Sequence, residues 1–215
     1  TGIVRVEAIK ELFNCAEALA MQPNPTGPNL TIITNAGGPA IMATDNLVAK
    51  GGKLSQLSGE TVDSLKRVLP AYCSVANPID VYEEATSDRF RKVLEICLKD
   101  PNSNGVLIVY TPQGATSPSA LAEIIAGLAK QTKKTILTSL MSEDSCCLEA
   151  RRFLRRHGIP SFTSPEEAVS TFMYMYSYAQ NSALLYQTPE EVPLKPANIA
   201  PLKGILRQAF CEGRK

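Results

Sequence analysis

The sequence predicts a three-layer α/β/α domain, in which helices cover both faces of a doubly wound parallel sheet of about five strands. Short apolar, β-branched segments alternate with longer segments whose apolar residues recur every three or four positions, as in βαβ units. Residues 106–110 are apolar throughout, which is typical of a strand buried on both faces. A chain of 215 residues with 44% hydrophobic residues is sufficient for such a core.

The elements follow one another along the chain. Residues 1–6 are β-prone, and residues 7–21 have the apolar spacing of a helix. Residues 74–81 predict an extended loop, because a proline at position 78 keeps Asn77 out of the helical region. The predicted strands are 30–34, 53–57, 106–110, 135–140 and 159–162, and the predicted helices are 39–50, 58–69, 87–99, 118–130, 146–156 and about 165–180.

This order is typical of a flavodoxin-like fold, and the composition divides the chain into three parts. Residues 1–29 are expected to be an entry strand, helix and loop that arrive from a preceding domain. Residues 30–180 form the flavodoxin-like domain. Residues 181–215 are a proline-rich linker followed by the start of a helix. Since position 1 is threonine and the chain stops just after a helical pattern, we expect a piece excised from a longer chain.

The bulk composition excludes several classes of function. A net charge of +1 gives no electrostatic case for nucleic acid or an acidic membrane surface. No apolar run reaches the length of a membrane span, and the given sequence does not open with the basic and apolar pattern expected of a signal peptide. The six cysteines are scattered without a C-x-x-C pair, so we expect a reduced, cytoplasmic protein.

The segment 30–40 organises the rest of the chain. An apolar strand ends at Thr34 and Asn35, two glycines and Pro39 follow, and a helical pattern then begins. We expect Pro39 at the first helical position, where no N–H is needed. Free N–H groups at such a helix start suit a phosphate or carboxylate, and the glycines allow close approach. An ordinary strand-to-helix turn explains the same residues.

Two further polar loops follow predicted strands. Residues 77–80 and 111–116 are expected to lie with residues 34–39 at the carboxyl ends of the strands, where sheets of this kind bind ligands. Asn77 and Asp80 are suited to bond either a ligand or the backbone, and an Asx-type turn fits equally well. The sequence contains no evident catalytic set. His157, in the last turn of a predicted helix beside glycine, matches the helix dipole, and a metal site has no support.

Four blocks occur in the order and spacing of a known family. They are Ile-Thr-Asn-Ala-Gly-Gly-Pro at 33–39, Ala-Asn-Pro-Ile-Asp-Val at 76–81, Thr-Pro-Gln at 111–113, and Gly-Ile-Pro at 158–160 followed by Ser-Pro-Glu-Glu-Ala-Val at 164–169. Over about residues 1–188, the chain resembles the NDP-forming, or ADP-forming, acyl-CoA and acetyl-CoA synthetases of the succinyl-CoA synthetase superfamily. It is similar to their second flavodoxin-like domain, the CoA-ligase domain.

The resemblance implies a site without a catalytic residue of its own. In the family, a histidine in a preceding domain is phosphorylated, and two helix N-termini, one from each flavodoxin-like domain, stabilise the phosphohistidine. The positions that carry this role over to this chain are Thr34, Asn35, Ala36, Gly37, Gly38 and Ala40, with Asn77, Asp80, Thr111 and Gln113 as supporting residues. Ala40 stands where we expect glycine in many members; its methyl group leaves the N–H available but narrows the approach. Lys53 and Tyr82 lie near the motifs and match no role.

The implied reaction interconverts acid, CoA and ATP with acyl-CoA, ADP and phosphate through a phosphohistidine relay. The resemblance assigns no bound cofactor to this part and gives ATP or ADP, Mg²⁺, CoA and phosphate to the complete enzyme. The expected partners of this part are the CoA-binding, phosphohistidine and ATP-grasp domains of the same enzyme. The resemblance is also compatible with an oligomer. The alternative is a synthetase-like module of a protein lysine acetyltransferase that senses acyl-CoA or nucleotide without ligase turnover. A flavin-binding domain is disfavoured by the absence of tryptophan.

Overall fold

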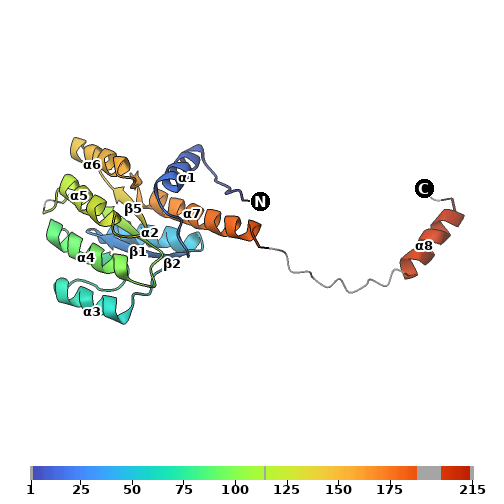
Figure 1. Ribbon diagram of the computed structural model, residues 1–215, viewed down its shortest axis with the longest axis horizontal. Coiled ribbons are helices and arrows are strands. Elements are labelled where there is room, and N and C mark those ends of the chain that lie inside the picture. The colour runs from blue at the N-terminus through green and yellow to red at the C-terminus, as the bar shows by residue number, and fades with distance from the viewer. Residues whose placement is uncertain (1, 114, 188–199, 214–215) are drawn as a thin grey trace. The chain divides into compact units, whose positions relative to one another are not determined.

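A computed structural model describes residues 2–113, 115–187 and 200–213. The chain divides into two compact units, residues 1–185 and residues 186–215. The first unit contains α1 to α7 and all of the strands (Figure 1). In the second unit the described helix is α8, Ala200–Cys211, where the sequence predicts the start of a helix. Residues 188–199, which belong to the predicted linker, lie outside the described residues.

The described strands form one parallel sheet in the order β2-β1-β4-β5-β6, with β3 also paired to β1. In β1, Leu30 pairs with Leu54 of β2, and Ile33 pairs with Ile79 of β3. The two short strands, β2 and β3, therefore lie one after the other along the same edge of β1. The sheet is thus five strands wide although it contains six described strands. The strands are β1 (Asn29–Thr34), β2 (Lys53–Leu54), β3 (Ile79–Asp80), β4 (Gly105–Tyr110), β5 (Thr135–Leu140) and β6 (Ser161–Phe162).

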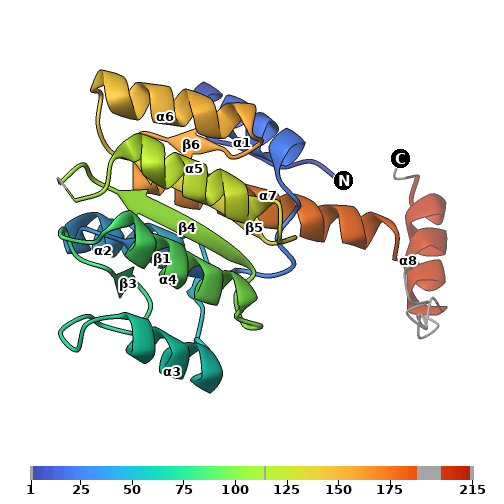
Figure 2. The same ribbon diagram turned by 60° about the vertical axis from the view of Figure 1, so that its left-hand side comes forward.

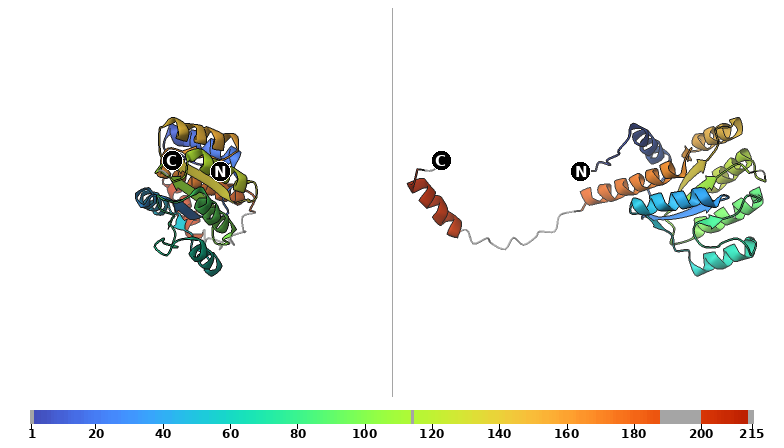
Figure 3. Two further views of the ribbon diagram at one scale, coloured as in Figure 1. Left: turned by 90° about the vertical axis from the view of Figure 1, so that its left-hand side faces the viewer. Right: turned by 180° about the vertical axis from the view of Figure 1, so that it is seen from behind.

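Helices cover both faces of the sheet, which confirms the three-layer prediction. Helices α3 to α6 pack on one face; α4 and α5 lie in front of the sheet in Figure 2. Helices α1, α2 and α7 pack on the other face, and the view from behind in Figure 3 brings α2 and α7 forward. The helices are α1 (Ile9–Met21), α2 (Gly37–Ala49), α3 (Gly59–Val68), α4 (Ser87–Lys99), α5 (Pro118–Ala129), α6 (Ser145–Arg156) and α7 (Pro165–Leu185).

The local sequence explains where most of these elements begin. Ser58, Thr86, Ser117 and Asp144 each accept a backbone N–H in the first turn of the helix that follows, which is standard N-capping. The two central strands, β4 and β5, are buried along their whole length, so their apolar side chains face helices on both sides.

The structure differs from the sequence prediction at several boundaries. Residues 79–80, expected in a loop, form a strand because β1 extends beyond the end of β2 and offers its edge. Residues 2–6 form no strand. β2 and β6 are two residues long, and α7 continues to Leu185 instead of ending near residue 180. Helix α1 forms as predicted, but Ile9 and Phe13 on its apolar stripe are exposed, while Cys15 and Ala18 face the core.

The six cysteines carry no disulfide, and Cys15, Cys73, Cys97 and Cys147 are buried. Burial raises the pKa of the Cys97 thiol well above its ordinary value. Among the described helices, none combines the length and the hydropathy that a membrane crossing requires.

Candidate functional site

Helix α2 begins two residues earlier than the sequence predicts. Its first residue is Gly37 and its N-cap is Ala36, so Pro39 occupies the third helical position and the expectation of a first position was wrong. The loop before the helix is closed locally: the Thr34 hydroxyl accepts the N–H of Ala36 at 3.0 Å and donates to its carbonyl at 2.9 Å. Pro39 still sacrifices no bond, because N–H groups in a first turn have no partner within the helix.

The first turn of α2 presents unpaired N–H groups. Ala36 provides no side-chain cap, and the turn contains no acidic residue. The N–H groups of the first residues of a helix have no acceptor within the helix itself. Within the described residues, the N–H groups of Gly37 and Gly38 therefore have no hydrogen-bond partner. Gly37 and Gly38 are exposed, so an anion can reach this turn.

Ala40 does not restrict this approach. Its side chain is 2% exposed and belongs to the core cluster beneath α2, so the methyl group faces inward. A side chain is also tolerated at Gly38, where an added Cβ would meet no atom within 4 Å. The space beside Gly38 is therefore open.

Asn35 joins the carboxyl ends of β1 and β4. Its amide nitrogen donates to the carbonyl of Thr111 at 2.7 Å, and its amide oxygen accepts the N–H of Thr111 at 2.9 Å. Asn35 is 4% exposed. These strands, β1 and β4, flank the point where the strand order reverses, which is where folds of this type bind ligands. Asn35 thus links the loops that follow β1 and β4.

Asn77 is also a structural residue in this unit. Its amide oxygen accepts the N–H of Ile32 at 2.9 Å, and its amide nitrogen donates to the carbonyls of Leu30 at 2.9 Å and Ser55 at 3.2 Å. The side chain therefore continues the sheet edge between β2 and β3. Of the two alternatives left by the sequence, bonding to the backbone is the one observed.

Asp80 is the supporting residue that reaches α2. One carboxylate oxygen, Oδ1, accepts the N–H of Tyr82 at 2.8 Å. The other, Oδ2, lies 3.4 Å from the position that a Cβ on Gly37 would occupy. A negative charge is favoured beside a helix N-terminus, so this carboxylate is well placed there.

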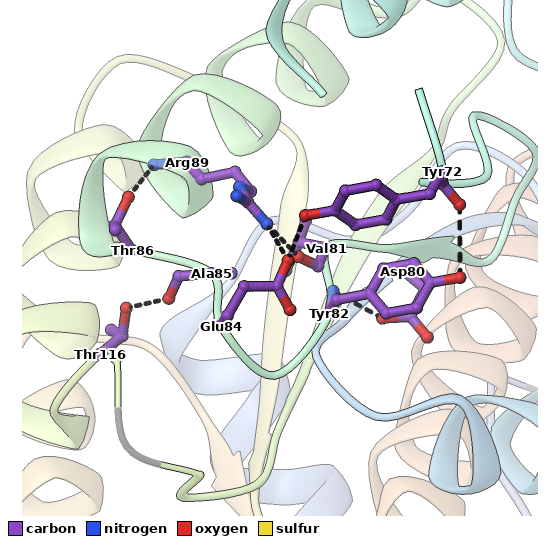
Figure 4. Close-up of polar contacts among 9 residues, drawn as sticks. All are labelled: Tyr72, Asp80, Val81, Tyr82, Glu84, Ala85, Thr86, Arg89 and Thr116. Atoms are coloured by element: carbon purple, nitrogen blue, oxygen red, sulfur yellow. Dashed lines mark hydrogen bonds and ion pairs between the residues drawn. The ribbon is translucent and has the colours of Figure 1, made fainter. Parts of the chain in front are cut away.

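Three polar side chains meet beside Asp80 (Figure 4). The Tyr72 hydroxyl donates to Glu84 Oε1 at 2.6 Å, and Arg89 donates to the same oxygen at 2.9 Å. Arg89 also donates to the carbonyl of Val81 at 2.9 Å. The hydrogen bond from Tyr72, followed by that from Arg89, lowers the pKa of Glu84 to about 2, so its carboxylate is charged at neutral pH.

Tyr82 lies within this loop in an unusual backbone conformation. Its φ of 65° is the one positive value among the described residues other than glycine. Its ring meets the ring of Tyr72 edge-on, with centroids 5.4 Å apart. The sequence offers no spacing that links Tyr72, Glu84 and Arg89, which come from different elements. For that reason the sequence analysis did not identify these three residues. It also could not identify Tyr82, because composition does not show which non-glycine residue adopts a positive φ.

The remaining candidates do not join this cluster. Gln113 is exposed and makes no hydrogen bond in the described chain. His157 caps the C-terminus of α6, where Nδ1 lies 2.8 Å from the carbonyl oxygen of Phe153. In the part of the chain that the structure describes, no group of three or more His, Cys, Asp or Glu side chains is placed to hold a metal ion.

Relatives and solved structures resemble this chain at the level of sequence and fold. The chain is 33% identical over its whole length to 4-hydroxybutyrate–CoA ligase (ADP-forming) of Nitrosopumilus maritimus. It is also 33% identical, over 85% of its length, to acetate–CoA ligase (ADP-forming) I of Archaeoglobus fulgidus. The structure of dinucleotide-forming acetyl-coenzyme A synthetase 1 from Ca. Korarchaeum cryptofilum, in complex with phosphate and ADP, covers 87% of the chain with a TM-score of 0.81 and 26% identity.

The chain spans 30% and 25% of the length of these two ligases and 41% of the solved chain. The family model described as the Ligase-CoA domain matches residues 30–186. The resemblance to ADP-forming acyl-CoA synthetases is thereby confirmed. Because this match includes every strand of the sheet and most of the chain, the chain belongs to the Ligase-CoA domain family.

Proposed function

We propose that this chain is the CoA-ligase domain of an ADP-forming acyl-CoA ligase, which interconverts acid, CoA and ATP with acyl-CoA, ADP and phosphate through a phosphohistidine. In this proposal, the first turn of α2 receives the phosphoryl group of a histidine in another domain. The observation that carries it is the pair of unpaired, exposed N–H groups at Gly37 and Gly38, in a family whose named relatives are ADP-forming ligases.

In phosphoryl transfer the protein performs little covalent chemistry. Its main task is to hold positive charges or N–H donors in fixed positions around the negatively charged phosphoryl group. The N–H groups of α2 and the positive end of its dipole supply that potential without a charged side chain. Gly37 and Gly38 allow phosphoryl oxygens to approach the backbone closely. The chain thereby stabilises a phosphoryl group that it does not itself carry.

Asp80 complements this turn. A phosphoryl group alone would be repelled by the nearby carboxylate, whereas a phosphohistidine also carries a ring N–H. Asp80 Oδ2, beside Gly37, is placed to accept that N–H and so to orient the ring. The exposed Gln113 is a further proposed contact with the docked segment.

Other predicted residues act indirectly. The side chains of Thr34, Asn35 and Asn77 form hydrogen bonds with backbone groups, and the Ala36 N–H donates to the Thr34 hydroxyl. In the proposal, these residues hold the backbone of the site in place and do not contact the phosphoryl group. Thr111 contributes through its backbone, which holds Asn35 in place.

The proposed partners are the CoA-binding, phosphohistidine and ATP-grasp domains of the same ligase. ADP and phosphate are bound in the solved relative, and we assign ATP, Mg²⁺ and CoA to those other domains. The first turn of α2 fits a phosphoryl anion. Among the described residues, no group of three or more His, Cys, Asp or Glu side chains could hold a metal ion. The relatives named above are ligases, so the acetyltransferase alternative gains no support from them.

The test is Gly38→Val in the complete ligase that contains this chain. A valine side chain has room at this position within the domain but occupies the space in front of the N–H groups. We expect phosphohistidine formation from γ-labelled ATP to fall by about a hundredfold or more, because the donors become inaccessible to the phosphoryl oxygens.

Gly59→Val is the matched control. Gly59 is also a first-turn glycine, at the start of α3, and an added Cβ there likewise meets no atom within 4 Å. Labelling should be unchanged in this variant. Unchanged labelling in Gly38→Val would overturn the role assigned to α2.

A further inference from the structure

The loop that follows β3, residues 81–86, is fixed from three sides. Tyr72, from the connection after α3, and Arg89, from α4, both donate to Glu84. Thr116, from the loop after β4, donates its hydroxyl to the carbonyl of Ala85 at 2.6 Å. Figure 4 shows these bonds converging on one short segment. The loop therefore has a single defined conformation.

Core packing holds the two ends of this loop, because Val81 and Ala85 are buried in the main core cluster, but it does not hold the exposed residues between them. Tyr72 is 59% exposed, and the Glu84 side chain is 48% exposed. Exposed ion pairs and hydrogen bonds contribute little to stability on average, since water competes for both partners. Three interacting side chains on a surface loop are more readily explained by a need to fix the backbone there.

The backbone at Tyr82 shows what is being fixed. A tyrosine at a φ of 65° is strained, because its Cβ crowds the neighbouring carbonyl in the left-handed region. Such strain persists where the surroundings over-determine the conformation, and it concentrates at functional sites. Here the strained residue directs its N–H to Asp80 Oδ1 at 2.8 Å. The turn is closed by a bond from the Ala85 N–H to the carbonyl of Tyr82 at 3.1 Å.

We propose that Tyr72, Glu84 and Arg89 are positioning residues for phosphoryl transfer: together they hold residues 80–82 so that the Asp80 carboxylate stands in front of the first turn of α2. This proposal rests on the function proposed above for α2 and Asp80. Arg89 anchors the segment before Tyr82 through the carbonyl of Val81, and Tyr72 anchors the segment after it through Glu84. The backbone of Asp80 is held by the pairing of β3 with β1, so loss of either anchor acts on the carboxylate: it releases the strain at Tyr82 and frees the carboxylate from the Tyr82 N–H.

The test uses Tyr72→Phe, Glu84→Gln and the double variant in the complete ligase. Each single variant should lower the first-order rate of histidine phosphorylation about tenfold, since small displacements of an orienting group are costly to rate. The KM for ATP should stay within about twofold, because the residues do not touch the nucleotide. The double variant should be no slower than the slower single variant, as expected for residues that act as one unit.

Glu83→Gln is the matched control. Glu83 is the neighbouring exposed glutamate, it loses the same charge, and it makes no hydrogen bond in the described chain. Its phosphorylation rate should equal that of the unmodified enzyme. A purely structural role would instead lower the melting temperature of the Tyr72 and Glu84 variants and leave the rate of the folded enzyme unchanged.

The outcomes separate this proposal from the one on which it rests. If Gly38→Val abolishes labelling while Tyr72→Phe and Glu84→Gln label at the normal rate, the role of α2 stands and the positioning role is wrong. If the two single effects multiply in the double variant, the residues act independently and the proposed unit is wrong. If the unmodified ligase forms no phosphohistidine, both proposals are wrong.

Discussion

The side chain of Asn35 and the backbone of Thr111 exchange two hydrogen bonds, at 2.7 and 2.9 Å, across the carboxyl ends of β1 and β4. This pairing continues the sheet by one step beyond the last ladder partners. It also fixes the distance between the loop that starts α2 and the loop that leads to α5. The two loops are therefore tied together at the ends of β1 and β4.

Asn35→Ala should lower the free energy of unfolding by about 2 to 3 kcal/mol, because both backbone groups of Thr111 lose their partners next to a residue that is 4% exposed. Urea denaturation of the chain measures this change. Asn24→Ala, at an exposed position without a hydrogen bond in the described chain, should change stability by less than about 0.5 kcal/mol. Equal effects of the two variants would contradict the bridging role.

Two glycines should respond to alanine in opposite directions. At Gly105 in β4, an added Cβ would lie 2.6 Å from the Phe172 ring and 3.2 Å from the Thr135 carbonyl, so alanine should destabilise by about 1 to 3 kcal/mol. At Gly127, within α5, an added Cβ meets nothing within 4 Å, and alanine should stabilise by about 0.5 to 1 kcal/mol through helix propensity. Thermal unfolding of both variants is the measurement. Destabilisation at both positions would show that the α5 surface is not free.

The acid sensitivity of the fold should depend on Asp100. Burial raises the pKa of this carboxyl, but hydrogen bonds from Thr61, Ser58 and Asn102 outweigh burial and hold the pKa below 3.8. Since the pKa is lower in the folded state, the carboxylate stabilises the fold above about pH 4, and this contribution is lost as the pH falls through the folded value. Urea midpoints between about pH 6 and pH 3 should therefore decline more steeply in the unmodified chain than in Asp100→Asn.

Asp45→Asn provides the comparison for that experiment. Asp45 lies on the exposed face of α2 and has no ion pair within the described residues. Its variant should retain the acid dependence of the unmodified chain. An identical loss of acid dependence in both variants would assign the effect to net charge instead of the buried carboxylate.

The Glu84 carboxyl should titrate far below its ordinary range. Its pKa of about 2 results first from the Tyr72 hydrogen bond and then from Arg89, so its contribution to stability is complete above about pH 4.5 and is lost as the pH falls toward about 2. Carboxyl carbon NMR should show this midpoint, and Tyr72→Phe should move it upward. A midpoint near 4.5 in the unmodified chain would contradict the observed pairing.

The arrangement of layers was predictable because it depends on periodic apolar patterns. The apolar run in β4 is continuous, and the helices after β4 and β5 are preceded by Ser117 and Asp144, residues that favour N-caps. The two-residue strand at Ile79 was not predictable, since its pairing depends on the free edge of β1 and not on its own sequence. The start of α2 was placed late because Gly37 and Gly38 are typical of a turn, whereas here they adopt helical geometry.

The gathering of the strand-end residues was predictable from the sequence, but the contacts of each residue were not, and the binding role of the site stays a prediction. The polar residues at the strand ends do gather at one edge, as parallel topology requires. Which of them face a ligand depends on partners that local sequence does not specify. Asn77 bonds to backbone groups that are 45 and 47 residues away in sequence, and the Arg89 contact with Val81 depends on how the loop folds back.

Under the function proposed above, the uncapped first turn of α2 links catalysis to the stability of the domain. A side-chain cap contributes about 1 kcal/mol to a helix, and α2 forgoes it. A phosphoryl group that binds the same N–H groups completes the helix in place of a cap, so the phosphorylated complex is also the better-folded one. Each turnover then alternately completes and exposes the helix end, and resistance of this segment to hydrogen exchange should follow the phosphorylation state of the ligase.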